Sequence, residues 1–223
     1  MADLKLLENQ GYSSTTYILD NDRKKYIIKV FNASNINRQF EFLINMKASK
    51  LDIGAKPIYL NQENSIMIYE YLEGKHKIKL KTKDIQNIAL LLKKVHKIKI
   101  KDKKLNFKKD YVLCHHDLNK RNFIFSDKVK LIDWEYACLD DKYFDLATTI
   151  IEFNLNKKEE DLFLKTYFKN KFHINRKKIF FFKMNYLNLC IQWFSKEDKI
   201  KEKISYKKKL LKILKKDGAD ERT

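Results

Sequence analysis

The sequence contains little cysteine, glycine or proline: 3 cysteines, 4 glycines and 1 proline among 223 residues. Cys114, Cys138 and Cys190 show no C-x-x-C spacing, and their odd number disfavours a disulfide framework. Long apolar runs are also missing, because no stretch reaches the roughly 18 consecutive apolar residues that a membrane-spanning helix needs. Residues 1–11 lack the apolar core of a signal peptide. We therefore expect a cytoplasmic protein without a membrane span.

Arginine is scarce too, so that almost all of the positive charge behind the formal net charge of +19 comes from lysine. Nucleic-acid recognition favours arginine, whose planar guanidinium binds phosphates and base edges with two hydrogen bonds. The lysines are scattered over every expected element, which indicates a compositional bias on a solvated surface. We expect no specific nucleic-acid partner. The alternative of a different class is a non-catalytic basic module that binds nucleic acid or an anionic membrane surface.

The most informative part of the sequence places polar residues after short apolar runs. An apolar run at 112–114 predicts a strand, and the loop that follows carries Asp117 and Asn122. Two further apolar runs predict a β-hairpin over 123–132, and Asp133 stands just past its second strand.

This order of carboxylate, amide and carboxylate suits phosphoryl transfer. That reaction requires a base beside the acceptor hydroxyl and hard oxygen ligands for the magnesium ion on the phosphates. We predict that Asp117 takes the proton of the acceptor hydroxyl, and that Asn122 and Asp133 hold Mg²⁺. The alternative is a polar loop and hairpin without catalytic activity.

The motifs of this segment also resemble those of known kinases. His-x-Asp-x-x-x-x-Asn at 115–122 is loosely similar to the catalytic loop of protein kinases, although Asp-Trp-Glu replaces their Asp-Phe-Gly. The segments LIDWEYA and FDLA resemble choline and ethanolamine kinases of the aminoglycoside phosphotransferase superfamily, especially the small bacterial choline kinases. The resemblance implies that His115 braces the catalytic loop and that Asp145 bonds back to it.

The same resemblance implies a protein-kinase-like bilobal α+β fold. Residues 1–72 would form a nucleotide-binding lobe with a small antiparallel β-sheet and one helix, and residues 73–223 a mainly helical catalytic and acceptor-binding lobe. Apolar alternation predicts strands at 15–20, 25–31, 58–60 and 65–71. Helical periodicity predicts helices at 35–51, 84–98, 143–153, 158–170, 176–194 and 199–216.

Lys29 lies in the second strand of the first predicted hairpin and resembles the strand lysine that binds the α- and β-phosphates of ATP. A buried lysine needs a compensating charge, and Glu41 is the acid that the helix at 35–51 offers. The alternative is a lysine that faces solvent.

The resemblance also implies that two further segments contact the nucleotide. Gly11, Ser13 and Ser14 precede the first hairpin strand and could cover the phosphates, although an ordinary turn explains this signal equally well. The segment that contains Glu70 and Leu72 would bind adenine through its backbone.

For the acceptor, the resemblance implies that Glu152 faces an amine, and Glu135 is a further possible contact beside Asp117. The resemblance also implies that Trp193 and Tyr206 contact a trimethylammonium group, since aromatic faces attract quaternary cations. The helix at 176–194 is apolar on nearly all sides and is therefore expected to be buried. The alternatives are a solvent-facing glutamate and ordinary core aromatics.

Together these residues predict an enzyme that uses ATP and Mg²⁺ to phosphorylate a small amino alcohol, choline before ethanolamine, giving phosphocholine from choline. Thiamine or an aminoglycoside is the alternative acceptor, although the basic acceptor lobe argues against polycationic aminoglycosides. The expected partners are ATP and the acceptor, and the expected state is a monomer or a homodimer.

Overall fold

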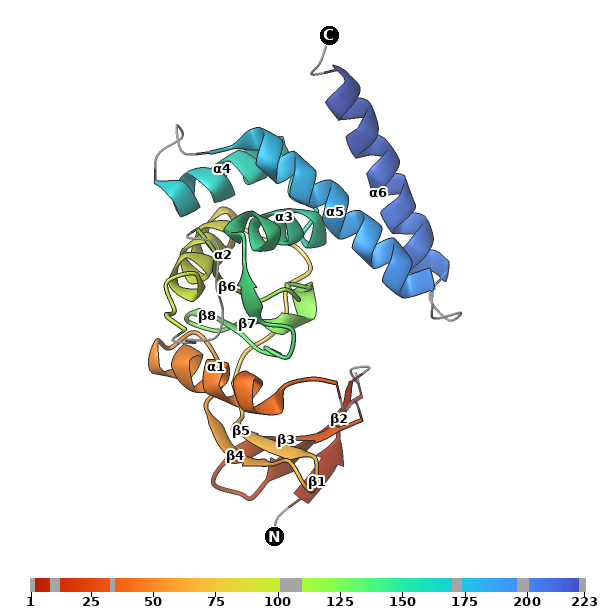
Figure 1. The fold of residues 1–223 in the computed structure, drawn as a ribbon. Coiled ribbons are helices and arrows are strands. Elements are labelled where there is room, and N and C mark those ends of the chain that lie inside the picture. Colours follow the sequence, from red (N-terminus) through yellow and green to blue (C-terminus); the bar gives the residue numbers. More distant parts are fainter. Residues whose placement is uncertain are drawn as a thin grey trace.

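The computed structural model describes residues 3–8, 13–32, 35–100, 110–169, 174–195 and 201–220. A β-sheet with one helix forms one end of the molecule, and a helical body forms the other (Figure 1). This arrangement confirms the predicted bilobal α+β fold. The exact boundary at residue 72 stays a prediction.

Within the described residues, the sheet has five antiparallel strands in the order β1-β2-β3-β5-β4. Their bounds are Asp3–Leu6 (β1), Ser14–Asp20 (β2), Lys25–Phe31 (β3), Pro57–Asn61 (β4) and Ile66–Glu70 (β5). The predicted hairpin is confirmed, because Ser14 pairs with Phe31 and Asp20 with Lys25. Strand β1 was not predicted: Asp-Leu-Lys-Leu alternates in polarity, but the segment is only 4 residues long and all four residues are exposed.

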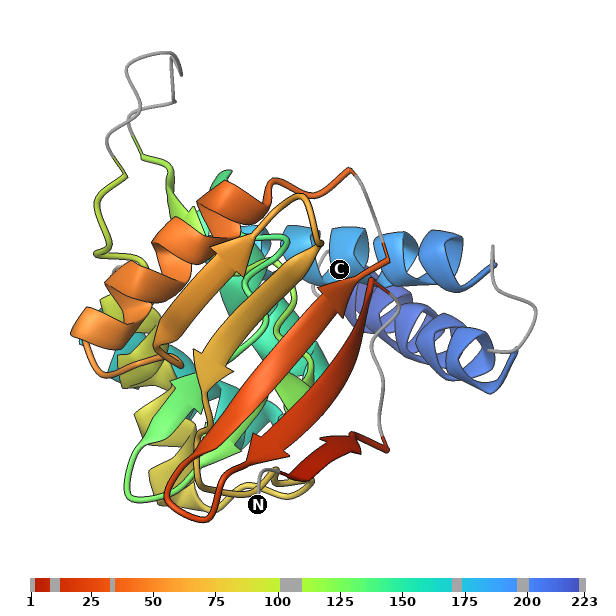
Figure 2. The same ribbon diagram turned by 90° about the horizontal axis from the view of Figure 1, so that it is seen from below.

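Helix α1 (Arg38–Lys50) lies between the sheet and the helical body, as Figures 1 and 2 show. It begins at Asn37, whose side chain accepts a hydrogen bond from the Phe40 N–H and so caps the first turn. One face of α1 is buried and carries Glu41, Ile44 and Ala48. The charged Glu41 is thereby held at the boundary between the two lobes.

The helical body contains α2 (Thr82–Val95), α3 (Lys142–Glu152), α4 (Lys157–Phe168), α5 (Arg176–Ser195) and α6 (Lys201–Asp220). Two small ladders lie between α2 and α3 in the sequence: β6 (Val112–Cys114) pairs with β9 (Cys138–Asp140), and β7 (Phe123–Phe125) pairs with β8 (Val129–Leu131). A short 3₁₀ turn, η1 (Lys120–Asn122), precedes β7. The loop from β6 to β7 therefore lies between the sheet and the helices (Figure 1).

The connection between the lobes crosses β7 closely, because Lys75 forms a bridge with Phe125. Gly74, just before it, has a φ angle of 151°. A Cβ atom at this position would lie 2.7 Å from Ile124 Cγ2. Glycine is required here both by the backbone conformation and by the close approach.

Helix α5 contradicts the expectation of burial on nearly all sides. Its buried residues form one stripe that includes Tyr186, Leu187 and Cys190, while Phe181 is 57% and Trp193 40% exposed. The helix packs against α3 on one side and α6 on another, as Figure 1 shows, and its remaining face meets solvent. Among the described residues, no helix is long and apolar enough to cross a membrane.

Candidate active site

The loop after β6 is fixed by the buried His115. Its Nε2 lies 3.0 Å from the carbonyl oxygen of Ile132, and its Nδ1 accepts a hydrogen bond of 3.3 Å from the Asp117 N–H. An acceptor at Nδ1 places the ring proton on Nε2, which then donates to Ile132. The imidazole thus joins the Asp117 loop to the residue before Asp133, which fits the bracing role that the resemblance implies.

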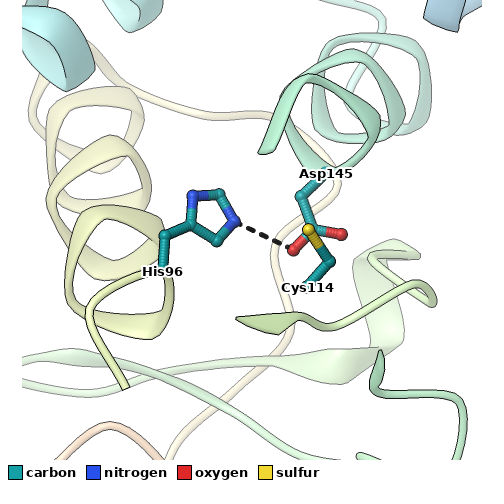
Figure 3. Close-up of side chains that lie close together, drawn as sticks. All are labelled: His96, Cys114 and Asp145. Carbon is teal, nitrogen blue, oxygen red and sulfur yellow. Dashed lines mark hydrogen bonds and ion pairs between the residues drawn. The ribbon is translucent and has the colours of Figure 1, made fainter. Parts of the chain in front are cut away.

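Asp145 of α3 holds the same loop from the other side. Its carboxylate is fully buried and accepts the backbone N–H groups of His115 at 2.8 Å and His116 at 3.1 Å. His96 Nε2 lies 3.2 Å from Asp145, and Figure 3 shows these two side chains converging with Cys114. Burial alone would raise the pKa of Asp145, but the hydrogen bonds from His96 and from the His115 N–H lower it.

His96, Cys114 and Asp145 have the composition of a metal site, since their ligand atoms lie within 4.8 Å of one another. However, both carboxylate oxygens of Asp145 already accept loop amides, and His96 Nδ1 lies 2.7 Å from the Tyr167 hydroxyl. Burial strongly raises the pKa of the Cys114 thiol, which keeps it protonated and a poor ligand. This cluster therefore works as a structural brace.

Asp117 is positioned by two amides. Asn122 Nδ2 donates to Asp117 Oδ2 at 2.8 Å, and Asn119 Nδ2 donates to Oδ1 at 3.1 Å and Oδ2 at 3.2 Å. Burial raises the pKa of Asp117, and the neighbouring Asp133 carboxylate adds to the rise, which the His115 and amide contacts oppose. A partly buried carboxylate with a raised pKa is suited to accept a proton. Asn119 was not singled out from the sequence, although it lies between the two predicted residues.

Asp133 follows β8 with a φ angle of 68°, a left-handed conformation that is uncommon for residues other than glycine. Lys29 Nζ donates to Asp133 Oδ1 at 2.5 Å. Burial alone would raise the pKa of Asp133, but the Lys29 ammonium holds it below its usual value. Asp133 is therefore a carboxylate at neutral pH, ready to bind a cation.

Lys29 and Glu41 are brought together as predicted. Glu41 is 1% exposed and accepts from Lys29 Nζ at 3.5 Å, Arg38 Nη1 at 2.6 Å and the Tyr69 hydroxyl at 3.1 Å. Burial would lower the pKa of Lys29, yet the carboxylates of Asp133, Glu41 and Glu135 raise it. Lys29 is thus a buried, permanently charged cation next to the predicted metal ligand.

Glu135 connects the Asp-Trp-Glu segment to the first lobe. Its buried carboxylate accepts from Ser13 Oγ at 2.7 Å and 2.6 Å and from Arg38 Nη1 at 3.0 Å. Ser14 is buried at the start of β2, while Gly11 lies outside the described residues. The contact of Glu135 with an acceptor, and that of the serines with phosphates, stay predictions.

The predicted acceptor residues differ in their exposure to solvent. Glu152, the last residue of α3, accepts from the Tyr186 hydroxyl at 2.7 Å and from the Lys207 ammonium. Trp193 is 40% exposed and Tyr206 46% exposed. The sequence did not single out Tyr186 or Lys207, because they lie 34 and 55 residues away from Glu152.

Glu70 and Leu72 lie at the end of the sheet and just beyond it. The Glu70 side chain is half-exposed and lies 3.6 Å from Lys56 Nζ, and the Glu70 N–H donates to the Lys56 carbonyl. Leu72 packs against the cluster of Ala55, Met67 and Tyr69. The contact of Glu70 and Leu72 with adenine stays a prediction.

The donor set of the site fits a magnesium ion. Asn122 uses its Nδ2 to bind Asp117, which leaves its amide oxygen as the atom for a metal, and Asp133 supplies a carboxylate oxygen. Carboxylate and amide oxygens are the ligands that Mg²⁺ takes in proteins. The arrangement brings together a carboxylate with a raised pKa, two oxygen atoms of the kind that bind Mg²⁺ and a buried lysine, which are the groups that phosphoryl transfer requires.

Comparison with known proteins agrees with this chemistry. The model of the phosphotransferase enzyme family matches residues 100–178. A LicA homologue from Metamycoplasma hominis is 32% identical over 200 residues, covering 74% of this chain and 78% of its own.

Solved structures show the same fold. Choline kinase LicA from Streptococcus pneumoniae superimposes with a TM-score of 0.76 at 20% identity, covering 96% of this chain and 92% of its own. A structure of LicA in complex with AMP superimposes with a TM-score of 0.69 at 22% identity, over 96% of this chain and 91% of its own.

Proposed function

This chain belongs to the phosphotransferase enzyme family and, within it, to the LicA proteins, and from that premise we propose that it transfers the γ-phosphoryl group of ATP to the hydroxyl of a small amino alcohol, choline before ethanolamine. Under this proposal residues 1–72 bind the nucleotide. Residues 73–223 carry the catalytic loop and the acceptor site.

The observation that carries the proposal is the ion pair between Lys29 and Asp133. It joins two residues that are 104 positions apart, with 2.5 Å between Nζ and Oδ1. The pair brings the predicted phosphate-binding lysine of the sheet to the predicted metal ligand of the helical lobe. A nucleotide bound between them would have its phosphates beside both groups.

In the reaction, Asp117 binds the acceptor hydroxyl and takes its proton as the oxygen attacks the γ-phosphorus, while the bond from the γ-phosphorus to the bridging oxygen breaks and ADP leaves with that oxygen. Its raised pKa supports this role, and Asn119 and Asn122 hold the carboxylate in one orientation. Lys29, kept charged by Glu41, binds the α- and β-phosphates. Asn122 and Asp133 would hold Mg²⁺, which supplies charge neutralisation on the phosphates when it is bound.

The acceptor's amine is assigned to the end of α3. Glu152 supplies the negative charge, and the aromatic residues of α5 and α6 supply faces that attract a cation. Because choline kinase LicA shares the fold, choline is the first acceptor to try. Ethanolamine is the second, since its primary ammonium can donate hydrogen bonds to Glu152.

The test measures ADP release from Mg·ATP with choline, ethanolamine, thiamine and kanamycin as separate acceptors. We expect release with choline that clearly exceeds the release without an acceptor. Turnover with another acceptor alone would keep phosphoryl transfer and replace the substrate. A chain that does not bind Mg·ATP would contradict the proposal and favour the non-catalytic basic module.

A further inference from the structure

Glu152, the carboxylate assigned to the acceptor's amine, is engaged by a cation of the chain itself. Lys207 of α6 binds Glu152 Oε1 with its ammonium group, and the Tyr186 hydroxyl of α5 donates to the same oxygen at 2.7 Å. The Lys207 Nζ also lies over the Tyr186 ring, 5.0 Å from its centroid. A carboxylate and an aromatic face together are the chemistry that recognises an ammonium ion.

This contact is a buried one. Lys207 is 7% and Tyr186 9% exposed, whereas Lys208 and Lys209 on the same helix are exposed. A lysine in an exposed pair contributes little, because water solvates it equally well when it is unbound. Among the α6 lysines whose side chains the structure describes, Lys207 is the buried one, and its ammonium lies against Glu152 of α3 and Tyr186 of α5.

Phe153, the residue that follows Glu152 in the sequence, contacts the catalytic loop. Phe153, next to Glu152, packs edge-to-face on Phe123, the residue after Asn122, with 5.1 Å between the ring centroids. Lys120 of the loop lies over Phe153 at 6.0 Å. Burial raises the pKa of the Cys190 thiol. The Lys207 ammonium lowers this pKa, and the Asp117 carboxylate raises it.

We propose that Lys207 is a specificity-determining residue of the acceptor site: its ammonium fills the subsite formed by Glu152 and Tyr186, and a cationic acceptor binds there by displacing it. This inference rests on the proposed function, because it concerns the subsite assigned to the acceptor's amine. A ligand that must displace an internal group binds with an affinity reduced by the fraction of molecules in which the site is open. Lys207 thereby sets how strongly an acceptor cation must interact with Glu152 and Tyr186 in order to bind.

The test uses tetramethylammonium as the probe, because it carries the cationic head without a hydroxyl to phosphorylate. Its dissociation constant is measured by calorimetry for the full-length chain and for Lys207→Met, Lys207→Arg and Lys208→Met. We expect Lys207→Met to bind tetramethylammonium about 10-fold more tightly than the unaltered chain. Lys208→Met removes an exposed ammonium and should bind as the unaltered chain does. Lys207→Arg keeps an internal cation at Glu152 and should not bind the probe more tightly than the unaltered chain.

Equal or weaker binding by Lys207→Met, or no binding by any of the four proteins, would overturn the proposal. If Lys207→Met fails to fold because the partly buried Glu152 is left without a cation, Lys207→Gln retains a hydrogen-bond donor without the charge and carries the same expectation. Tighter binding by Lys207→Met in a chain that phosphorylates none of the acceptors would support the inference and contradict the proposed function. Turnover of choline with equal affinities for the probe would overturn the inference alone.

Discussion

At the scale of single residues, the site depends on charged side chains that are shielded from water and held by hydrogen bonds or ion pairs. Asp117 is held by two amides, and Asp133 by a lysine that is itself held by Glu41. The two carboxylates have pKa values displaced in opposite directions, upward for Asp117 and downward for Asp133. Carboxylates whose environments separate their pKa values are suited to different tasks, here a base and a metal ligand.

Replacement of Asp117 by Asn tests the base. Since the amide cannot accept the proton, turnover should fall by about 10² to 10⁴-fold, while the affinity for Mg·ATP stays within about twofold. Steady-state kinetics and a nucleotide-binding titration measure the two quantities. Asp127→Asn, in the exposed turn of the β7–β8 hairpin, is the matched control. Undiminished turnover in Asp117→Asn would contradict the assignment.

The pH dependence of the reaction follows from the same residue. A base must be deprotonated, so kcat/KM should fall as the pH decreases through the pKa of Asp117. Because burial raises that pKa above its ordinary value of 3.8, the acid limb should lie at a higher pH than for an ordinary aspartate. A profile that stays flat down to the ordinary value would contradict a raised pKa.

Arg38 is a positioning residue that joins two buried carboxylates. Its Nη1 donates to Glu41 at 2.6 Å and to Glu135 at 3.0 Å, and its guanidinium lies 3.9 Å from the centroid of the Phe31 ring. Arg38→Met should leave both carboxylates without this partner and cost about 3 to 5 kcal/mol of folding stability.

The readout for Arg38 is a denaturant titration together with the KM for ATP. Loss of the Arg38 contacts should raise this KM as well, because Glu41 orients Lys29. Arg23→Met, in the exposed turn between β2 and β3, should change neither quantity. An Arg38→Met variant with the stability and KM of the unaltered chain would show that the guanidinium does not position these carboxylates.

At the scale of the elements, α3 links the core to the catalytic loop. Its first turns present Asp145 to the loop amides, and its last residue is Glu152, in the proposed acceptor subsite. One helix therefore carries both the aspartate that holds the Asp117 loop and the glutamate that we propose binds the amine, so that the separation of these two carboxylates is set by helical geometry.

Asp145→Asn should destabilise the protein by about 1 to 3 kcal/mol at neutral pH, since an amide nitrogen then faces a loop N–H. The pKa of Asp145 is lowered in the folded state, so the carboxylate stabilises the fold above its ordinary pKa of 3.8, and this contribution is lost as the pH falls through the lowered value. The stability difference between the two proteins should therefore narrow at acid pH. Unfolding titrations at several pH values measure it, and a difference that grows on acidification would contradict the role.

Helix α5 offers a test of its one-sided burial. Leu187→Ala removes a side chain with 0% exposure and should cost about 2 to 5 kcal/mol, because it leaves a cavity between helices. Phe181→Ala changes a side chain that is 57% exposed and should cost well under half as much. Thermal unfolding compares the two variants, and equal losses would contradict the observed orientation of α5.

At the scale of the whole molecule, the site exists only where the two lobes meet. Lys29, Glu41 and Ser13 come from the sheet and α1, whereas Asp117, Asp133 and Glu135 come from the helical body. The contacts of Lys29 with Asp133 and of Ser13 with Glu135 cross this boundary. Any nucleotide bound at this boundary would therefore contact both lobes.

Much of this arrangement could be predicted from the sequence, because strand alternation and helical periodicity are local signals. The β2–β3 hairpin, the β7–β8 hairpin and the pairing of Lys29 with Glu41 are examples. Contacts between distant segments gave no such signal. Lys207 belongs to a helix rich in lysine, and only the packing of α6 on α5 distinguishes it from the exposed lysines beside it.

The expected burial of helix α5 on nearly all sides was wrong for a related reason. Its apolar residues surround the whole helix, so periodicity could not identify the face that α3 and α6 cover. Strand β1 is difficult to predict for a different reason, because it is held to β2 by backbone hydrogen bonds and buries none of its side chains. Backbone pairing of an exposed edge strand leaves little mark on a sequence.

We propose above all that the chain transfers phosphoryl groups to an amino alcohol with Asp117 as the base. Phosphorus NMR of the protein with ATP, Mg²⁺ and choline tests it most directly, because it distinguishes a phosphomonoester from inorganic phosphate. We expect a phosphocholine signal that grows in step with ADP and is nearly absent for Asp117→Asn. Release of ADP with inorganic phosphate alone, or equal phosphocholine signals from both proteins, would contradict it.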